Sequence, residues 1–293
     1  MEYEFHQKRN YVKMKKLFIL GMSCFIVFFV LGTLVWFFIE QRDAKVAEVD
    51  QTFNKDDINQ LVVNTDVVNV TFKAGQQFHV HYKGADKLNV TRQGKTLQIM
   101  ERLHSKRKML NLNPFVTNKE CLVVAIPPNY LKNLSVTTQI ANIDMKGIQL
   151  DNVMLWNDMN GELNINDCQF KNAQIKGEET LVNIRESQFA KSDIYVERGL
   201  INTQKFNVQQ SLFKVDEGDM RLLKMAPQCN LKGVVNQGDI EMSYAQPPQH
   251  VRLMLSPTNG DATIQSPHLK QGLNGQAKHQ VELYTNDGDI VIR

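Results

Sequence analysis

Hydrophobic and polar residues recur in a five-residue pattern, Gly-Asp-apolar-x-apolar, through the C-terminal half of the chain. Four clear copies start at Gly218, Gly238, Gly260 and Gly288, and weaker copies start at Ala141, Gly161, Thr180 and Gly199. Consecutive starts lie 20, 19, 19, 19, 20, 22 and 28 residues apart. A period close to 20 residues predicts stacked or meandering β units, each of which needs its neighbours for stability.

The third and fifth positions of the pattern form two apolar columns. The third-position residues are Ile143, Leu163, Val182, Ile201, Met220, Ile240, Ala262 and Ile290, and the fifth-position residues are Met145, Ile165, Ile184, Thr203, Leu222, Met242, Ile264 and Ile292. Fifteen of these sixteen residues are hydrophobic, against 42% of the whole chain. Because side chains alternate along a strand, both columns are predicted to face a core, and the mostly polar fourth position is predicted to face water. The fourth-position residues are Asp144, Asn164, Asn183, Asn202, Arg221, Glu241, Thr263 and Val291.

The start of each unit is expected to be a turn, which makes the chain all-β. Asn160-Gly161, Asn259-Gly260 and Asp287-Gly288 are pairs that accept positive φ at little cost. A looser apolar stretch precedes each turn, so that a unit reads strand, turn, strand. The even spacing favours a β-solenoid-like domain of stacked coils. The alternative is an antiparallel β-meander or sandwich, since Asn-Gly and Asp-Gly are also strong hairpin turns.

One segment near the N-terminus is long and apolar enough to cross a membrane. Residues 17–39 contain no charged side chain, and about 20 apolar residues span a bilayer core. No small-x-small cleavage site follows, which favours an uncleaved signal anchor over a cleaved signal peptide. Residues 1–16 carry the whole net charge of +3, because the acidic and basic residues after the span cancel.

By the positive-inside rule, this charge predicts a bacterial membrane protein with a cytoplasmic N-terminus and residues 40–293 outside the cytoplasm. A neutral outer part lacks the basic footprint that nucleic-acid binding requires. The predicted organisation is a cytoplasmic tail (1–16), a transmembrane anchor (17–39), a juxtamembrane linker (40–58) and an extracytoplasmic β-repeat domain (59–293). Within that domain, leading strands (59–134) precede the repeats (135–293).

The order of these segments resembles a known family. A single N-terminal span is followed by the short strand VVNTDVVNVTF, the strand KTLQIMER, the segment LVVAIPPNYLKNLSV and then the Gly-Asp units. This order is similar to the bacterial "putative adhesin" family, whose members are envelope proteins of unknown function. The resemblance covers roughly residues 58–293 and implies an extracytoplasmic β-solenoid-like domain without catalytic residues. The chain departs from the family pattern at residues 141, 180 and 199–203, where Gly-Asp is lost, so the register of the middle units stays open.

Three groups of side chains are candidates for binding chemistry. The column Asp219, Asp239, Asp261 and Asp289 either stabilises the turns or forms a carboxylate ladder for Ca²⁺, and turn chemistry is favoured because close like charges repel. His79 and His81 lie two residues apart on one expected strand, so both point to the same side and could chelate a metal. An exposed strand face is the favoured interpretation, because the sequence offers no third ligand. The cluster Lys106-Arg107-Lys108 lies in a polar loop, where contact with an anionic polymer is the less favoured alternative to solvation.

No motif of a known enzyme class occurs, so no catalytic, cofactor-binding or metal-ligating residue is predicted, and no cofactor. Cys121, Cys168 and Cys229 do not form a disulfide framework, and Cys168 and Cys229 are expected to be small buried groups. The favoured function is a non-enzymatic, membrane-anchored envelope protein that contacts other envelope proteins or cell-wall polymers. The alternatives are an accessory or sensor protein of an envelope-stress response and a polysaccharide-active enzyme.

Overall fold

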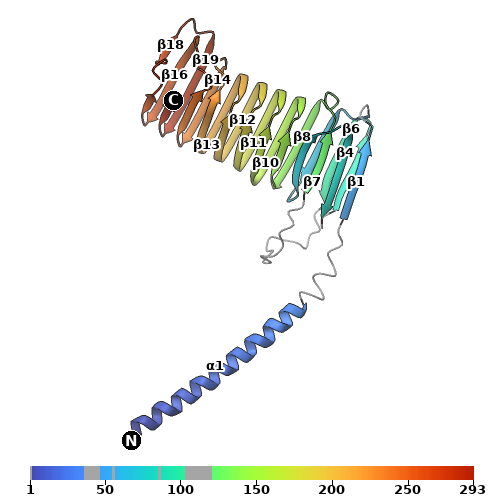
Figure 1. Ribbon diagram of the computed structural model, residues 1–293, viewed down its shortest axis with the longest axis vertical. Helices are drawn as coiled ribbons and strands as arrows, with labels where there is room; N and C mark the ends of the chain where they lie inside the picture. Colours follow the sequence, from blue (N-terminus) through green and yellow to red (C-terminus); the bar gives the residue numbers. More distant parts are fainter. Residues whose placement is uncertain (1, 36–46, 55–56, 85–86, 103–120) are drawn as a thin grey trace. The chain divides into compact units, whose positions relative to one another are not determined.

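The computed structural model describes residues 2–35, 47–54, 57–84, 87–102 and 121–293. The chain divides into two compact units, Met1–Val46 and Ala47–Arg293. The first contains the single described helix and the second contains all described strands (Figure 1). The predicted β-repeat domain at residues 59–293 lies within the second unit, which also contains the first strand at Ala47–Phe53. The basic cluster at residues 106–108 lies outside the described residues.

The N-terminal helix α1 spans Glu2–Val35. Its segment Lys15–Leu34 has a mean hydropathy of 2.5, and the structure buries none of it. By length and composition this one described helix can cross a membrane. The helix begins at Glu2 and therefore includes most of the predicted tail, while residues 36–39 of the predicted span lie outside the described residues.

The described part of the β unit contains 20 strands that are hydrogen-bonded into one continuous sheet. Their bounds are β1 (Ala47–Phe53), β2 (Gln60–Thr65), β3 (Asn69–Ala74), β4 (Phe78–Gly84), β5 (Lys87–Gln93), β6 (Thr96–Arg102), β7 (Cys121–Ile126), β8 (Asn133–Ile140), β9 (Ile143–Lys146), β10 (Gln149–Asn166), β11 (Gln169–Arg185), β12 (Gln188–Gln204), β13 (Asn207–Met225), β14 (Leu231–Gln237), β15 (Ile240–Tyr244), β16 (Val251–Asn259), β17 (Ala262–Ile264), β18 (Gly272–Asn274), β19 (His279–Asp287) and β20 (Ile290–Ile292).

Parallel pairing between β10, β11, β12 and β13 makes the central coils of a β-solenoid. Leu163, Val182, Ile201 and Met220 are register partners in successive coils. The Gly-Asp starts therefore fall at equivalent positions, including Thr180 and Gly199, where the family pattern is lost. This confirms the β-solenoid-like fold, excludes the antiparallel meander for these units and fixes the register of the middle repeats.

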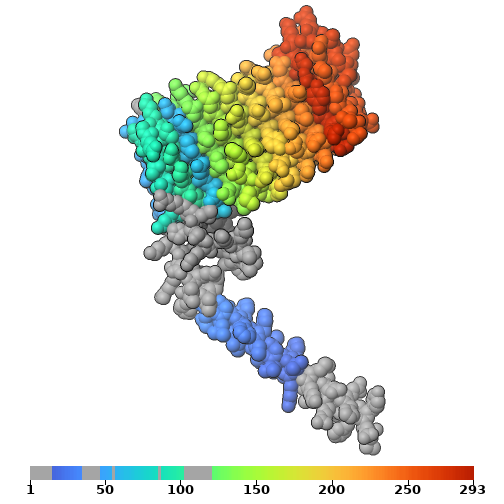
Figure 2. Space-filling view, turned by 180° about the vertical axis from the view of Figure 1, so that it is seen from behind, coloured from blue at the N-terminus to red at the C-terminus, as the bar shows by residue number. Residues whose placement is uncertain are grey.

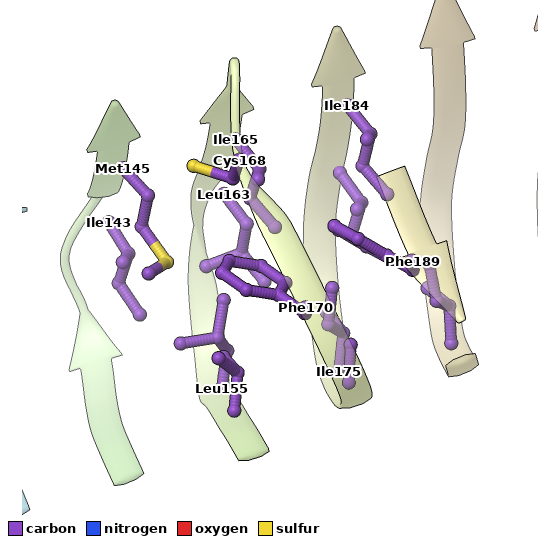
Figure 3. Packing of buried hydrophobic residues seen from close by; sticks show 14 of the residues in the cluster. Ile143, Met145, Leu155, Leu163, Ile165, Cys168, Phe170, Ile175, Ile184 and Phe189 are labelled. Atoms are coloured by element: carbon purple, nitrogen blue, oxygen red, sulfur yellow. The ribbon is translucent and has the colours of Figure 1, made fainter. Parts of the chain in front are cut away.

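The two apolar columns form the core of the solenoid. Every member of both columns is buried except Ala262 and Ile264, and the one polar member, Thr203, is fully buried. Figure 3 shows Ile143, Met145, Leu163 and Ile165 projecting into the same interior as Leu155 and Phe170. Ala262 and Ile264 are exposed or half-buried because β17 pairs only with β20 and has no coil on its other side. Each coil thus depends on its neighbours to cover its apolar side chains.

The stacking order differs from the sequence order at both ends. At the C-terminal end, β19 lies between β14 and β16, and β20 lies between β15 and β17. At the other end, β2 lies between β6 and β8, and β3 lies between β7 and β9. Figure 2 shows the latter insertion as a blue band between the cyan and green strands. The last strands of the chain therefore close into the stack, which explains the irregular spacings of 22 and 28 residues.

Antiparallel strands cover the edges of the end coils. β1 pairs with β4, β4 pairs with β7, and β5 pairs with β6, while β18 pairs with β16. The predicted linker 40–58 is thus wrong for residues 47–53, which form β1. The leading segment is also more regular than predicted, because β2–β3 and β6–β7 stack in parallel register with the repeats. Covered or short edges limit pairing with other chains.

Glycine at the corner of most coils allows the backbones of adjacent coils to approach closely. The φ angles of Gly199, Gly218, Gly238, Gly260 and Gly288 lie between 131° and 149°. A Cβ atom on Gly218 would collide with the carbonyl oxygen of Gly199 in the neighbouring coil. These five corners therefore exclude any side chain for two reasons, the positive φ and the close carbonyl oxygen.

At Thr180, where the repeat has no glycine, the corner of the coil is held by a buried network of hydrogen bonds. The Asn157 side chain donates to Thr138 Oγ1 and to the carbonyl oxygens of Ala141 and Asn160, and Asn157 Oδ1 accepts from Thr180 Oγ1 at 3.1 Å. Asn157, Thr138 and Thr180 are all buried. Satisfied polar groups can be buried at little cost, whereas an unpaired amide would be expensive.

A second column of turns lies at the far end of the strand segment that follows each Gly-Asp start. Asp167, Glu186, Lys205 and Lys224 have φ angles of 53°, 49°, 52° and 53°, and Gly147 starts the column at 66°. Residues other than glycine pay a strain cost of about 1–2 kcal/mol in this left-handed conformation. The column is invisible in the sequence because only its first member is a glycine.

The two turn columns predict opposite effects for reciprocal substitutions. Gly218→Ala should destabilise the β unit by about 3 kcal/mol or more, since strained φ and a backbone collision combine. Lys224→Gly should be neutral or should stabilise by up to about 1 kcal/mol, because it relieves left-handed strain at an exposed site. Chemical denaturation of both variants measures these changes. Equal losses in the two variants would contradict the coil geometry.

Candidate interaction face

The Asp column connects neighbouring coils rather than closing its own turns. Asp219 Oδ1 accepts the backbone N–H of Asp239 at 3.1 Å, and Asp239 Oδ1 accepts that of Asp289 at 2.8 Å. Asp289 Oδ1 in turn accepts the N–H of Asp261 at 2.8 Å. The residues are brought together as predicted, but in the order 219, 239, 289, 261, and the first three carboxylates each accept a backbone N–H of the next coil. This geometry supports a structural role for the column.

His79 and His81 lie on the exposed side of β4, as expected, and a third residue joins them. Asp50 on β1 lies 2.6 Å from His79 Nε2 and 3.6 Å from His81 Nδ1. Hydrogen bonding to His79 is the largest effect that lowers the pKa of Asp50 below its ordinary value. Among the described residues, no group of three or more His, Cys, Asp or Glu side chains is placed to hold a metal ion. The cluster joins the first strand of the β unit to β4.

The buried cysteines are inert. Cys168 and Cys229 are free and fully buried, in agreement with the expected role as small core groups. Burial raises the pKa of Cys168 to about 11 and that of Cys229 to about 12, so neither thiol forms the nucleophilic thiolate near neutral pH.

The outward side of β8, β10–β14, β19 and β16 carries amide, charged and aromatic side chains. Three columns of residues run along it, and their members are register partners in successive coils except for Asn230, which directly precedes β14. The first column is Asn133, Asn152, Asn172, Lys191, Gln210, Asn230, Gln280 and Arg252; the second is Ser135, Met154, Gln174, Asp193, Leu212, Lys232, Glu282 and Met254; the third is Thr137, Trp156, Lys176, Tyr195, Lys214, Val234, Tyr284 and Ser256. We call this surface the amide–aromatic face.

Amide side chains form a hydrogen-bonded ladder at one margin of the face. Asn152 Nδ2 donates to Asn133 Oδ1 at 2.7 Å, and Asn172 Nδ2 donates to Asn152 Oδ1 at 2.9 Å. The ladder ends at Asn172, where a shallow open groove begins. This groove has a volume of about 670 Å³ and is lined by Lys171, Asn172, Ala190, Lys191, Gln209, Gln210 and Asn230. It crosses several coils, so an occupant would lie along the solenoid axis.

Lysine ammonium groups lie over aromatic rings along the third column. Lys176 Nζ is 4.8 Å from the centre of the Trp156 ring, and Lys232 Nζ is 5.4 Å from that of Tyr284. Such cation–π contacts hold a cation in place without neutralising it. Trp156 remains 41% exposed. The rings therefore position positive charge at the surface and offer apolar area beside it.

Lys214 differs from these lysines because a carboxylate neutralises it. Its Nζ lies 2.8 Å from Asp216 Oδ1, while the Tyr195 hydroxyl donates to Asp216 Oδ2 at 2.5 Å. Hydrogen bonding to Asp216 raises the pKa of Tyr195 to about 12, and Lys214, followed by Tyr195, lowers the pKa of Asp216. Asp216 is thus held ionised, which makes it unsuited to act as a general acid.

Sequence reasoning missed the amide–aromatic face, although its period carries the signal. Tyr195, Lys214, Val234 and Tyr284 each lie four residues before a unit start. Trp156 lies five residues before Gly161, because β10 has a bulge between Asn157 and Asn160. Aligning the residues before each turn, as well as those after it, would have placed the aromatic and basic side chains in one column.

Comparison with known proteins identifies the family. The family model described as Toastrack DUF4097 matches residues 58–293. The chain therefore belongs to the Toastrack DUF4097 family. A search of curated proteins finds no match.

Solved structures share the fold at low sequence identity. A putative adhesin from Parabacteroides distasonis ATCC 8503 is 11% identical, with a TM-score of 0.53 and coverage of 85% of this chain and 98% of that chain. A putative lipid binding protein from the same organism is 10% identical, with a TM-score of 0.52 and coverage of 84% and 97%. At these identities, the likeness describes the fold alone.

The inter-coil bonds of the Asp column predict a graded response to substitution. Asp239→Ala should cost about 0.5–1.5 kcal/mol, because the N–H of Asp289 loses its acceptor. Asp239→Asn should be nearly neutral, since the amide oxygen accepts the same bond. Asp261→Ala is the matched control, because no described N–H donates to its side chain. Thermal unfolding with and without millimolar Ca²⁺ measures each variant.

Added Ca²⁺ should leave the melting temperature unchanged. A Ca²⁺-dependent rise that Asp239→Asn abolishes would contradict the structural role, since a ligand that binds only the folded state stabilises it by mass action. An equal loss for Asp261→Ala and Asp239→Ala would contradict the stacking order.

The Asp50 cluster predicts a pH dependence of β1 attachment. The folded pKa of Asp50 is lowered, so its contribution to stability is complete above its ordinary pKa of about 4 and is lost as the pH falls through the folded value. Carboxyl titration by NMR should give Asp50 a midpoint below the ordinary aspartate value of about 4. His79→Gln should raise the Asp50 midpoint, and an unchanged midpoint would refute the assigned cause.

Proposed function

We propose that this protein is a non-enzymatic, membrane-anchored component of the bacterial cell envelope, with its β unit outside the cytoplasm. The apolar helix α1 provides the anchor, and the positive charge of residues 1–16 favours a cytoplasmic N-terminus. The β unit serves as a rigid platform that presents the amide–aromatic face to other envelope components. Family membership and the fold shared with proteins named as adhesins are consistent with this role.

The chemical composition of the amide–aromatic face is the main support for an interaction role. Amides, aromatic rings and cations lie open along several coils, and Trp156 and Met154 are substantially exposed. A stack of coils held by backbone hydrogen bonds keeps these side chains at fixed spacing. A face of this kind offers binding groups without the closed cavity that small-molecule sites use.

The described carboxylates do not favour the polysaccharide-active alternative. Glycoside hydrolysis needs a protonated acid opposite a second carboxylate. The pKa of Asp216 is lowered by Lys214 and Tyr195, and three of the four Asp-column carboxylates are engaged with backbone N–H donors. These groups serve structural pairing, which supports a binding role over a hydrolytic one.

The topology predicts where the β unit is accessible. A reporter enzyme that is active only outside the cytoplasm should give a signal when it is fused after Arg293. Protease added to intact protoplasts should digest the chain beyond residue 45. The matched control replaces Lys8, Arg9, Lys13, Lys15 and Lys16 with Gln, which removes the orienting charge and should lower the correctly oriented fraction. Full protection of the native β unit from protease would contradict the envelope role.

A further inference from the structure

We propose that the amide–aromatic face binds an extended anionic polysaccharide, which lies along the solenoid axis across successive coils. The inference deepens the proposed function by naming the chemical class of partner for this face. It depends on four features of the face: its repeat distance, its unengaged hydrogen-bonding groups, its unneutralised cations and its aromatic rings.

The repeat distance of the face suits a linear polymer of sugar rings. Adjacent coils are hydrogen-bonded strands, so equivalent side chains recur about every 4.8 Å along the axis. A linear polysaccharide presents its rings and their substituents at a comparable, regular interval. The groove begins at Asn172 and continues across Lys191, Gln210 and Asn230, one residue from each of four successive coils. A chain in this groove would therefore meet similar groups at each step.

Several polar side chains of the groove are unengaged by the protein. Within the described part of the chain, the Gln209, Gln210 and Lys191 side chains make no hydrogen bond or ion pair, while Lys171 pairs with Asp151. A primary amide both donates and accepts hydrogen bonds, which matches the hydroxyl and carboxylate groups of sugars. The groove can thus exchange bonds to water for bonds to a polyhydroxylated chain.

Charge favours an anionic polymer over a neutral one. The three columns contain five basic residues, Lys176, Lys191, Lys214, Lys232 and Arg252, against two acidic ones, Asp193 and Glu282. Of the five, only Lys214 has a carboxylate partner among the described residues. Glu282 already accepts bonds from Tyr284 and Gln280. Four basic side chains without a carboxylate partner are thus spread over six coils. This arrangement matches a polymer whose negative charges are also spread along its length.

The aromatic rings add contact that charge alone does not supply. Trp156 and Tyr284 carry Lys176 and Lys232 over their rings, so each pair offers an ammonium group beside an amphipathic surface. The carbon–hydrogen edges of a sugar can pack on such a surface while its anionic group approaches the lysine. A protein partner is less favoured, because the exposed apolar residues Met154, Leu212 and Met254 lie on separate coils and form no continuous apolar centre.

Binding of polygalacturonate by the full chain in zwitterionic nanodiscs tests the proposal. Polygalacturonate is a linear anionic polysaccharide, and its fully methyl-esterified form keeps the sugar backbone but removes the charge. Poly-L-glutamate keeps the charge but removes the sugar. We expect the native protein to bind polygalacturonate at least about tenfold more tightly than either control, with an affinity that falls as salt is added.

Two triple variants with the same change in charge locate the site. Lys176→Gln, Lys191→Gln and Lys232→Gln together should weaken polygalacturonate binding by about tenfold or more. Lys73→Gln, Lys146→Gln and Lys224→Gln together change exposed lysines away from the face and should weaken it less than about twofold. Trp156→Ala should also weaken binding, although it leaves every charge in place. Circular dichroism checks that each variant keeps the β fold.

Each other outcome would overturn the inference. Equal losses in both triple variants would indicate general charge attraction, and equal binding of poly-L-glutamate would indicate a polypeptide-like polyanion. Tight binding of the methyl ester would indicate a neutral glycan. Absence of polygalacturonate binding would refute the polysaccharide proposal but leave the envelope role standing, because protease accessibility in protoplasts tests that role separately.

Discussion

Parallel backbone hydrogen bonding between coils is the constraint on which the rest of this structure depends. It requires successive coils to follow the same path, so each coil must have nearly the same length and must turn at the same points. The glycine corners permit the close approach of neighbouring backbones, and the second turn column accepts left-handed strain at Asp167, Glu186, Lys205 and Lys224. Since strain of this kind persists only where its surroundings enforce it, the stack itself must hold these turns in place.

The same constraint explains the ends of the stack. An open parallel stack would expose unpaired backbone groups and apolar columns at both ends. The chain limits this exposure by inserting β2–β3 and β19–β20 one coil inward and by adding the antiparallel strands β1, β4, β5 and β18. Both ends of the β unit are therefore paired by hydrogen bonds within the sheet. The contact between Asp50 and His79 adds a polar interaction between β1 and β4.

A regular stack also converts a repeating sequence into a repeating surface. Side chains that point inward must be apolar and of constrained size, whereas those that point outward are free to vary. The outward residues can thus become a binding surface without any change in the fold, which is why function has to be argued from the amide–aromatic face and not from the family or the scaffold. The cations over Trp156 and Tyr284 are the most distinctive groups of that face.

The sequence predicts the features that follow from local pattern. The apolar columns from Ile143 to Ile292 and the turns at the Gly-Asp starts could be predicted, because alternation and turn chemistry are local signals, whereas the register of the middle units needed the structure. The insertion of β19–β20 could not, because the order of stacking depends on which coil edges remain free. β1 was missed because its strand carries charged residues and pairs along one edge only, with β4. The partner of His79 was missed for the same reason, since Asp50 lies on that strand.

Deletion of one whole coil tests the central claim most directly. Gln188 and Asn207 are register partners, so removal of residues 188–206 joins Ser187 to Asn207 and leaves every other coil in register. The account predicts that this variant keeps a β-rich circular dichroism spectrum and a cooperative thermal transition. Removal of residues 188–196, about half a coil, should break the register and abolish that transition. If the two deletions unfold the β unit equally, or if both leave it equally stable, the stacked-coil account is contradicted.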